Sequence, residues 1–202
     1  MKYARMLAAF ALVVSFFAPA LARAAETDST PIALRPTWTE GSSWRYDYDE
    51  NGQKNWSLHR YMGLVEENGA KYHLVQTNYW RFYFDSDLNL VRKAHVKRGV
   101  TSQYDPPFTD FSWPLHVGKK WTQRTVHSGA EFFGNAEEWA FEVVAYEKVK
   151  TSAGEFDAFR ILAKRTSGGD TSMTKEYWYA PAAKRLVKYE IQATLDPKAH
   201  TI

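Results

Sequence analysis

The sequence predicts an all-β protein built from a single curved antiparallel sheet of about ten strands, a half-barrel or open barrel preceded by a signal peptide. Three observations favour this fold class. Aromatic residues make up 16% of the chain and fall at alternating positions, which is the period of a strand. Asn-Gly pairs separate alternating segments. No stretch of eleven or more residues after the expected signal shows a helical period of 3.6.

Residues 1–24 have the form of an export signal. Lys2 and Arg5 precede an uncharged apolar run from Met6 to Ala22, and small residues follow in the pattern that signal peptidase cleaves. The run is shorter than the roughly 20 residues of a transmembrane helix. We therefore expect a periplasmic or secreted protein with no membrane span after cleavage, in which residues 25–202 form one β-rich domain.

Composition narrows the classes of function. The chain has no cysteine, which excludes a lipobox, disulfides, zinc-thiolate sites and thiol catalysis. Removal of the expected signal takes away three basic residues and leaves 23 basic and 23 acidic ones. A formally neutral chain argues against nucleic acid as a partner.

The first half of the chain predicts a five-strand meander. Residues 42–49 place Trp44, Tyr46 and Tyr48 on one face, and residues 55–66 alternate in the same way. Asn-Gly pairs at 51–52 and 68–69 indicate tight hairpins, because both residues tolerate positive φ. The other strands are expected at 71–78, 79–84 and 88–98, with a turn at 85–87.

The second half is expected to begin with a loop and continue with strands. Residues 104–121 contain three prolines and no periodicity, so we expect a loop across an end or edge of the sheet, held by Phe108, Phe111 and Trp113. Residues 181–185 are expected to form a solvated turn with Lys184 and Arg185 exposed at its tip. Strands are expected at 120–128, 138–149, 156–165, 171–179 and 186–193.

Long strands predict curvature. Several segments approach eleven or twelve residues, and long strands in a meander of this size twist and curl. Within residues 174–179, Trp178 points to one side and Tyr177 and Tyr179 point to the other, so both faces require cover. We expect a filled concave side and a segment over part of the convex side.

Three segments of the second half stand in a characteristic order: "FSWPLHVGKKWTQR" (111–124), "VKTSAGEFDAFRI" (149–161) and "YWYAPAAKRLVKYE" (177–190). Together they resemble a broad group of exported bacterial proteins of unknown function that includes the TapB-like proteins. The resemblance covers about 80 residues and implies a β-rich envelope protein, with a half-barrel similar to lipoprotein carriers as one architecture open to it; it implies no reaction. Members of the group commonly have glycines where this chain has Ala182, Ala183 and Lys184, which implies a different turn here.

The sequence contains no catalytic, cofactor-binding or metal-binding constellation. None of the six histidines pairs at i, i+2 or i, i+4. The adjacent acids Glu66-Glu67 and Glu137-Glu138 face opposite sides of a strand. A hydrolase of cell-wall sugars needs two acids about 5 to 9 Å apart beside a groove, and the spacing proposes no such pair. A nucleophile elbow and a P-loop are also missing from the sequence. We therefore expect a protein that is not an enzyme.

The aromatic residues are either core or a ligand surface. Within residues 79–84, the apolar face is expected to be core, and the Tyr-Arg-Tyr face is either solvated or the wall of a groove. Six tryptophans on expected strands are interpreted as core: Trp44, Trp56, Trp80, Trp121, Trp139 and Trp178. The candidate ligand-lining residues are Tyr79, Arg81, Tyr83, Tyr177 and Tyr179.

Two classes of function stay open. The first is a non-catalytic periplasmic protein that holds a lipid or another apolar or amphipathic ligand within the curved sheet. The second is an interaction module without a cavity, which binds another envelope protein through an exposed edge strand or through residues 104–121.

Overall fold

A computed structural model describes residues 31–195 except 51, 100, 130–131 and 168–170. The expected signal peptide, residues 1–24, lies outside the described residues. The described chain is all-β and forms one antiparallel sheet of eleven strands in the order of the sequence. None of the described residues forms a helix long and apolar enough to cross a membrane.

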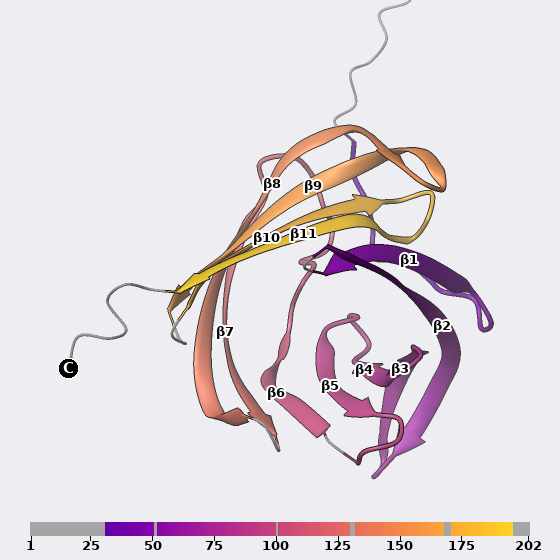
Figure 1. The fold of residues 1–202 in the computed structure, drawn as a ribbon, viewed down its shortest axis with the longest axis vertical. Coiled ribbons are helices and arrows are strands. Elements are labelled where there is room, and N and C mark those ends of the chain that lie inside the picture. The colour runs from indigo at the N-terminus through magenta and orange to yellow at the C-terminus, as the bar shows by residue number, and fades with distance from the viewer. Residues whose placement is uncertain (1–30, 51, 100, 130–131, 168–170, 196–202) are drawn as a thin grey trace, which may run out of the picture.

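The sheet curls around its own concave side, as Figure 1 shows, but it does not close. The first and last strands are its two edges, so the predicted open, curved sheet is confirmed. The strands are β1 (Ser43–Glu50), β2 (Gln53–Glu67), β3 (Ala70–Gln76), β4 (Trp80–Phe84), β5 (Leu90–His95), β6 (Thr101–Phe108), β7 (Lys120–Gly129), β8 (Phe132–Thr151), β9 (Gly154–Ser167), β10 (Thr171–Ala180) and β11 (Arg185–Leu195).

The hairpin between β2 and β3 follows from its Asn-Gly sequence. Asn68 and Gly69 both have positive φ, 53° and 78°, which a two-residue turn with the twist of the flanking strands requires. Glu67 pairs with Ala70 directly across this turn. The earlier hairpin places Gly52 at φ 83° in the same way, while its partner residue 51 lies outside the described residues.

The prediction of a loop from residue 104 is wrong at its beginning, because residues 101–108 form β6. The ladder between β6 and β7 ends at Asp105, so Pro106 and Pro107 follow its last paired residue and cost it no hydrogen bond. Their carbonyl oxygens accept instead from the side chains of Thr125 and Gln123, at 2.6 and 2.9 Å. This extra strand raises the count from about ten to eleven.

The loop of residues 109–119 packs against the inner side of β8, β9 and β10. Phe111 and Trp113 contact the ring of Tyr179, with centroids 5.3 and 5.0 Å apart. Leu115 exchanges two backbone hydrogen bonds with Ala33, at 2.9 and 2.8 Å. The aromatic residues therefore hold the loop as expected, and an N-terminal segment joins it over the core.

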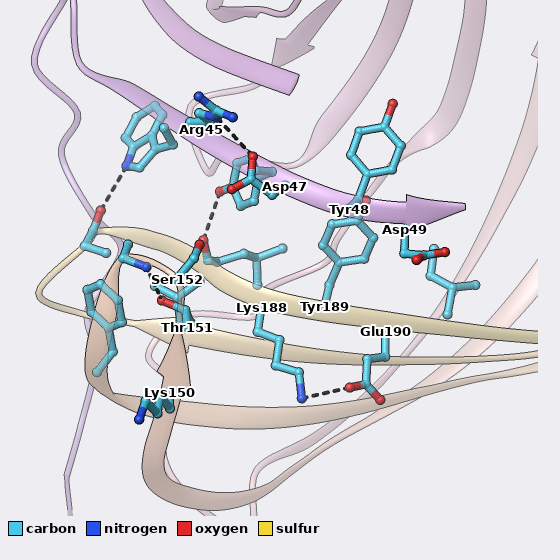
Figure 2. A pocket seen from close by; sticks show the side chains of 18 of the residues that line it. Arg45, Asp47, Tyr48, Asp49, Lys150, Thr151, Ser152, Lys188, Tyr189 and Glu190 are labelled. Carbon is cyan, nitrogen blue, oxygen red and sulfur yellow. Dashed lines mark hydrogen bonds and ion pairs between the residues drawn. The ribbon is translucent and has the colours of Figure 1, made fainter. Parts of the chain in front are cut away.

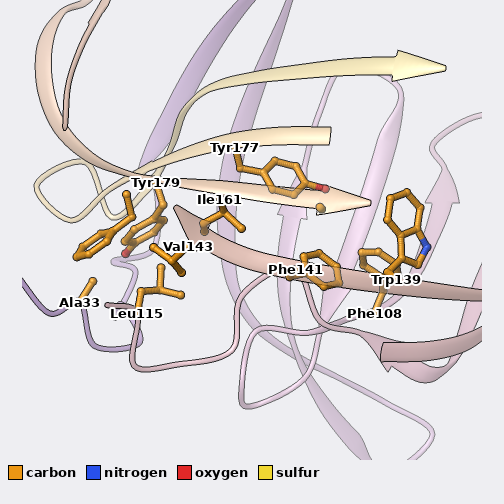
Figure 3. Close-up of a cluster of buried hydrophobic side chains, with 11 residues drawn as sticks. Ala33, Phe108, Leu115, Trp139, Phe141, Val143, Ile161, Tyr177 and Tyr179 are labelled. Carbon is orange, nitrogen blue, oxygen red and sulfur yellow. The ribbon is translucent and has the colours of Figure 1, made fainter. Parts of the chain in front are cut away.

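Both faces of the sheet near β10 are covered, as expected. The main core lies on the concave side (Figure 3), and Tyr177 and Tyr179 belong to it. Trp178 belongs to a second, smaller cluster on the opposite face with Val149 and Ala158. The main core consists of Ala33, Phe108, Leu115, Trp139, Phe141, Val143, Phe159, Ile161, Ala163, Tyr177 and Tyr179.

The interpretation of Trp56 as core is wrong. Its side chain is 51% exposed, and Met62 and Leu64 on the same strand are also exposed. Trp56 lies on the outer side of β2, where the guanidinium of Arg45 lies over its ring at 5.2 Å. Alternation in the sequence identifies two faces of a strand but does not say which of them another segment covers.

Leu115 tests whether the loop contributes to the core. Its side chain is fully buried, so Leu115→Ala leaves a cavity and should lower the free energy of unfolding by about 2–5 kcal/mol. Denaturant unfolding followed by tryptophan fluorescence measures this change. The matched control is Leu34→Ala, because Leu34 is 74% exposed and should change stability by less than about 0.5 kcal/mol. Equal effects of the two substitutions would contradict the packing of the loop.

Candidate functional site

A cavity of about 350 Å³ that opens to solvent lies where β1, β2, β4 and β11 face one another on the concave side. The alternation of β1 turns Tyr46 and Tyr48 inward, and the hairpin register places Ser57 of β2 opposite Tyr46. Trp80 and Phe82 enter the cavity from the β4 side. The lining is therefore mostly aromatic.

His59 lies in the aromatic wall of this cavity. Its ring meets that of Tyr46 edge to face at 4.7 Å and stacks on Phe82 at 6.2 Å. Burial lowers the pKa of His59 to about 4, and the charge of Arg185 lowers it as well. His59 is therefore neutral at pH 7.

Arg185 is not exposed at the tip of its turn, which corrects the expectation from the sequence. Lys184 adopts φ 53°, and the chain then turns Arg185 toward the inside, where its side chain is half-buried and lines the cavity. The guanidinium carbon lies 4.9 Å from the ring centroids of both Trp38 and Trp44. The indole of Trp38 is fixed in turn by a 2.9 Å hydrogen bond to the carbonyl oxygen of Lys184.

Arg185 has a neutral neighbour and no acidic one at contact distance. Its Nη2 lies 3.4 Å from Nδ1 of His59, and because a guanidinium only donates, Nδ1 is the acceptor. None of the ion pairs found among the described residues includes Arg185. The cavity therefore contains one cation whose charge is not paired within the described chain.

A second polar cluster lies in the packed half of the interior. The hydroxyl of Tyr177 donates a 3.0 Å hydrogen bond to Oδ1 of Asp110. Burial raises the pKa of Asp110, while the charges of Lys175 and, more weakly, Arg185 oppose this rise. Lys175 lies over the ring of Trp139 at 4.3 Å. Within the part of the chain that the structure describes, no group of three or more His, Asp or Glu residues is placed to hold a metal ion.

The two edge strands face each other across a seam (Figure 2). No backbone ladder joins β1 to β11; instead, Nε1 of Trp44 donates to the carbonyl oxygen of Ala183 at 3.1 Å, and the hydroxyl of Tyr46 donates to that of Leu186 at 2.9 Å. A cleft of about 1130 Å³ runs along the two strands, and the turn between β8 and β9 around Ser152 also lines it. Tyr189 points from β11 toward β1 in Figure 2 and also lines the cavity beside His59, so the two spaces adjoin there.

The structure does not gather the five candidate ligand-lining residues into one site. Tyr79 lines the cavity and is 62% exposed. Arg81 is exposed. Tyr83 is buried beneath a guanidinium 3.6 Å from its ring centroid. Tyr177 and Tyr179 are buried in the main core.

Three residues of the cavity region were missed by sequence reasoning. His59 was within reach, because the Asn-Gly hairpin fixes the register that places it opposite Trp44, on the same face as Tyr46. Arg185 and Trp38 gave no local signal. Their contacts join residues 146 and 126 positions apart, which only the tertiary curl of the sheet brings together.

Comparison with known proteins does not assign the site. No family model matches the chain, and no curated protein or solved structure matches it either. The function therefore has to be argued from the geometry of the described residues.

The low pKa of His59 makes stability depend on pH. The unfolded chain binds the imidazole proton near pH 6.5 and the folded chain near pH 4, so this contribution to stability is present at neutral pH and is lost as pH falls through that window. Unfolding measured from pH 7 to 4 should therefore show a steeper loss for the wild type than for His59→Gln. An NMR titration of the His59 ring should give a midpoint of about 4, and a midpoint near 6.5 would contradict the buried position.

Proposed function

We propose that this protein binds an apolar or amphipathic ligand in the cavity beside His59 and acts in the cell envelope without catalysing a reaction. One observation carries the proposal: the concave side contains an aromatic-lined cavity beside its packed core. The loop of residues 109–119 fills the space against β8–β10, whereas an aromatic-lined cavity remains between β1, β2, β4 and β11.

The size and lining of the cavity support a small apolar ligand. A volume of about 350 Å³ falls at the lower end of the range for sites that bind organic molecules. Trp80, Phe82 and Leu186 offer apolar surface, and each 100 Å² that a ligand covers contributes about 2.5 kcal/mol of transfer free energy. Tyr79 and Tyr189, both more than 40% exposed, stand where the cavity meets solvent.

The titratable groups support binding and not catalysis. His59 is held neutral between two aromatic rings, and the described residues place no carboxylate in contact with it. Asp110 is engaged by Tyr177 in the packed half of the interior. The proposed envelope location rests on the expected signal peptide.

Filling the cavity should weaken ligand binding. Ser57 is a small residue in the wall, so Ser57→Phe should weaken binding of the fluorescent apolar probe N-phenyl-1-naphthylamine by roughly tenfold or more, because the new ring occupies the probe's volume. Arg60→Phe adds the same ring to an exposed position of the same strand and should leave affinity within about twofold. A wild-type protein that does not bind the probe, or equal binding by both variants, would reject the proposal.

A second candidate function is recognition of another envelope protein through the seam. The observation that favours it is the pair of edge strands, which a partner strand can extend by backbone hydrogen bonds. Ile191, 53% exposed on β11, lies along this edge. Residues 104–121 are a weaker choice, because Phe108 and Phe111 face the core.

Edge recognition predicts a separate effect of mutation. Ile191→Lys should reduce binding of a partner purified by cross-linking at least tenfold, because a charge on an edge strand opposes strand addition, and should leave probe uptake unchanged. The control is Val126→Lys, at a position 38% exposed on β7, away from the seam. Equal partner binding by both variants would exclude the seam as the contact.

A further inference from the structure

Arg185 is a cation placed to receive an anion. Its side chain is half-buried on the concave side, and the ion pairs among the described residues leave it without a carboxylate partner. Removing a charge from water without a partner is unfavourable, so buried charges are normally paired. Within the described chain Arg185 has only neutral partners, His59 and Tyr46 among them, so its charge is compatible with a ligand that carries the opposite charge.

The surroundings of Arg185 fix the guanidinium before a ligand arrives. The indole rings of Trp38 and Trp44 both contact it, with centroids 4.9 Å from its central carbon. A held guanidinium presents a planar fork of N–H donors that matches the two oxygens of a carboxylate. Little side-chain entropy then remains to be lost when the anion binds.

The local charge favours a single negative charge on the ligand. Arg185 is the one cationic side chain that lines the cavity within the described residues, because the pKa of His59 is lowered to about 4 and its ring is neutral at pH 7. The carboxyl of Asp110 is near enough for the charge of Arg185 to lower its pKa, and any negative charge there opposes a second charge on the ligand. One fixed cation therefore matches a monoanion better than a dianionic phosphate monoester.

We propose that Arg185 binds the carboxylate of a fatty-acid-like ligand whose apolar chain lies along Trp80, Phe82 and Leu186. This inference rests on the proposed function and adds the chemical class of the ligand. The carboxylate meets the N–H edge of Arg185 beside neutral His59, and the chain extends through the cavity toward the exposed Tyr79 and Tyr189. The cavity thus has the cation Arg185 at one end and mostly aromatic side chains along its wall.

The test compares ligands that differ only in the head group. Decanoate and decanol each compete with N-phenyl-1-naphthylamine for the wild-type protein at pH 7.5, and decanoate should bind about 10- to 100-fold more tightly. Equal affinities would overturn the role of Arg185 and leave the proposed function standing. Failure of the protein to bind the neutral probe at all would overturn the proposed function itself. Tighter binding of decyl phosphate than of decanoate would overturn the carboxylate assignment.

Substitutions of arginine test whether Arg185 binds the carboxylate of decanoate. Arg185→Gln should reduce the preference for decanoate over decanol to about one, where the preference is the ratio of the two affinities measured in the same variant. Arg45→Gln is the control, because Arg45 is an exposed arginine of β1 that pairs with Asp47 at 3.0 Å; it should keep the full preference.

Arg185→Lys covers the case in which loss of the charge unfolds the chain. Lysine keeps the positive charge but lacks the planar pair of N–H donors, so the preference for decanoate over decanol should fall several-fold. Circular dichroism of each variant establishes folding. An undiminished preference for decanoate in either folded Arg185 variant would overturn the inference.

Discussion

Two hydrogen bonds from β1 side chains to backbone carbonyl oxygens set the relative position of the sheet's edges, and the interior depends on them. Trp44 and Tyr46 donate to Ala183 and Leu186 where a closed barrel has a backbone ladder. Side-chain donors thus connect the two edges at a place where no backbone ladder joins them. The stack of Trp44 on Arg185 and the shape of the cavity beside Tyr46 both follow from this junction.

A single sheet without helices has to cover its concave side with its own connections. Here the segment around Ala33 and the loop of residues 109–119 meet through Leu115 and fill the side of β8–β10. On the opposite side Trp38 packs against Tyr61, His73 and Phe84 of β2, β3 and β4. The cavity lies beside this contact, between β1, β2, β4 and β11.

The strand pattern was within reach of sequence reasoning because it is local. Alternation in β1 and the positive φ of Asn68-Gly69 depend only on neighbouring residues, and these predictions are confirmed. β6 was missed because its prolines argue against a strand, although they lie just beyond the last residue paired with β7. Trp56 was placed wrongly because alternation does not say which face is covered.

The candidate site was harder to predict, since it forms where the two ends of the sheet meet. Arg185 looked like the charged tip of an ordinary turn, and only the positive φ of Lys184 together with the curl of the sheet brings it beneath Trp38. His59 is intermediate: the first hairpin fixes its neighbour Tyr46, but the approach of Arg185 is a long-range contact.

The meander order also bears on how the molecule assembles and fluctuates. Every ladder joins strands that are consecutive in the chain, so loop closure costs little at each step, whereas the bond from Trp44 to Ala183 spans 139 residues. We expect this junction to form last during folding. It is also the contact that parts most easily in the native state, because separating it breaks no backbone ladder. Transient separation of β1 from β11 then lets solvent enter the interior, while the ten ladders between consecutive strands stay intact.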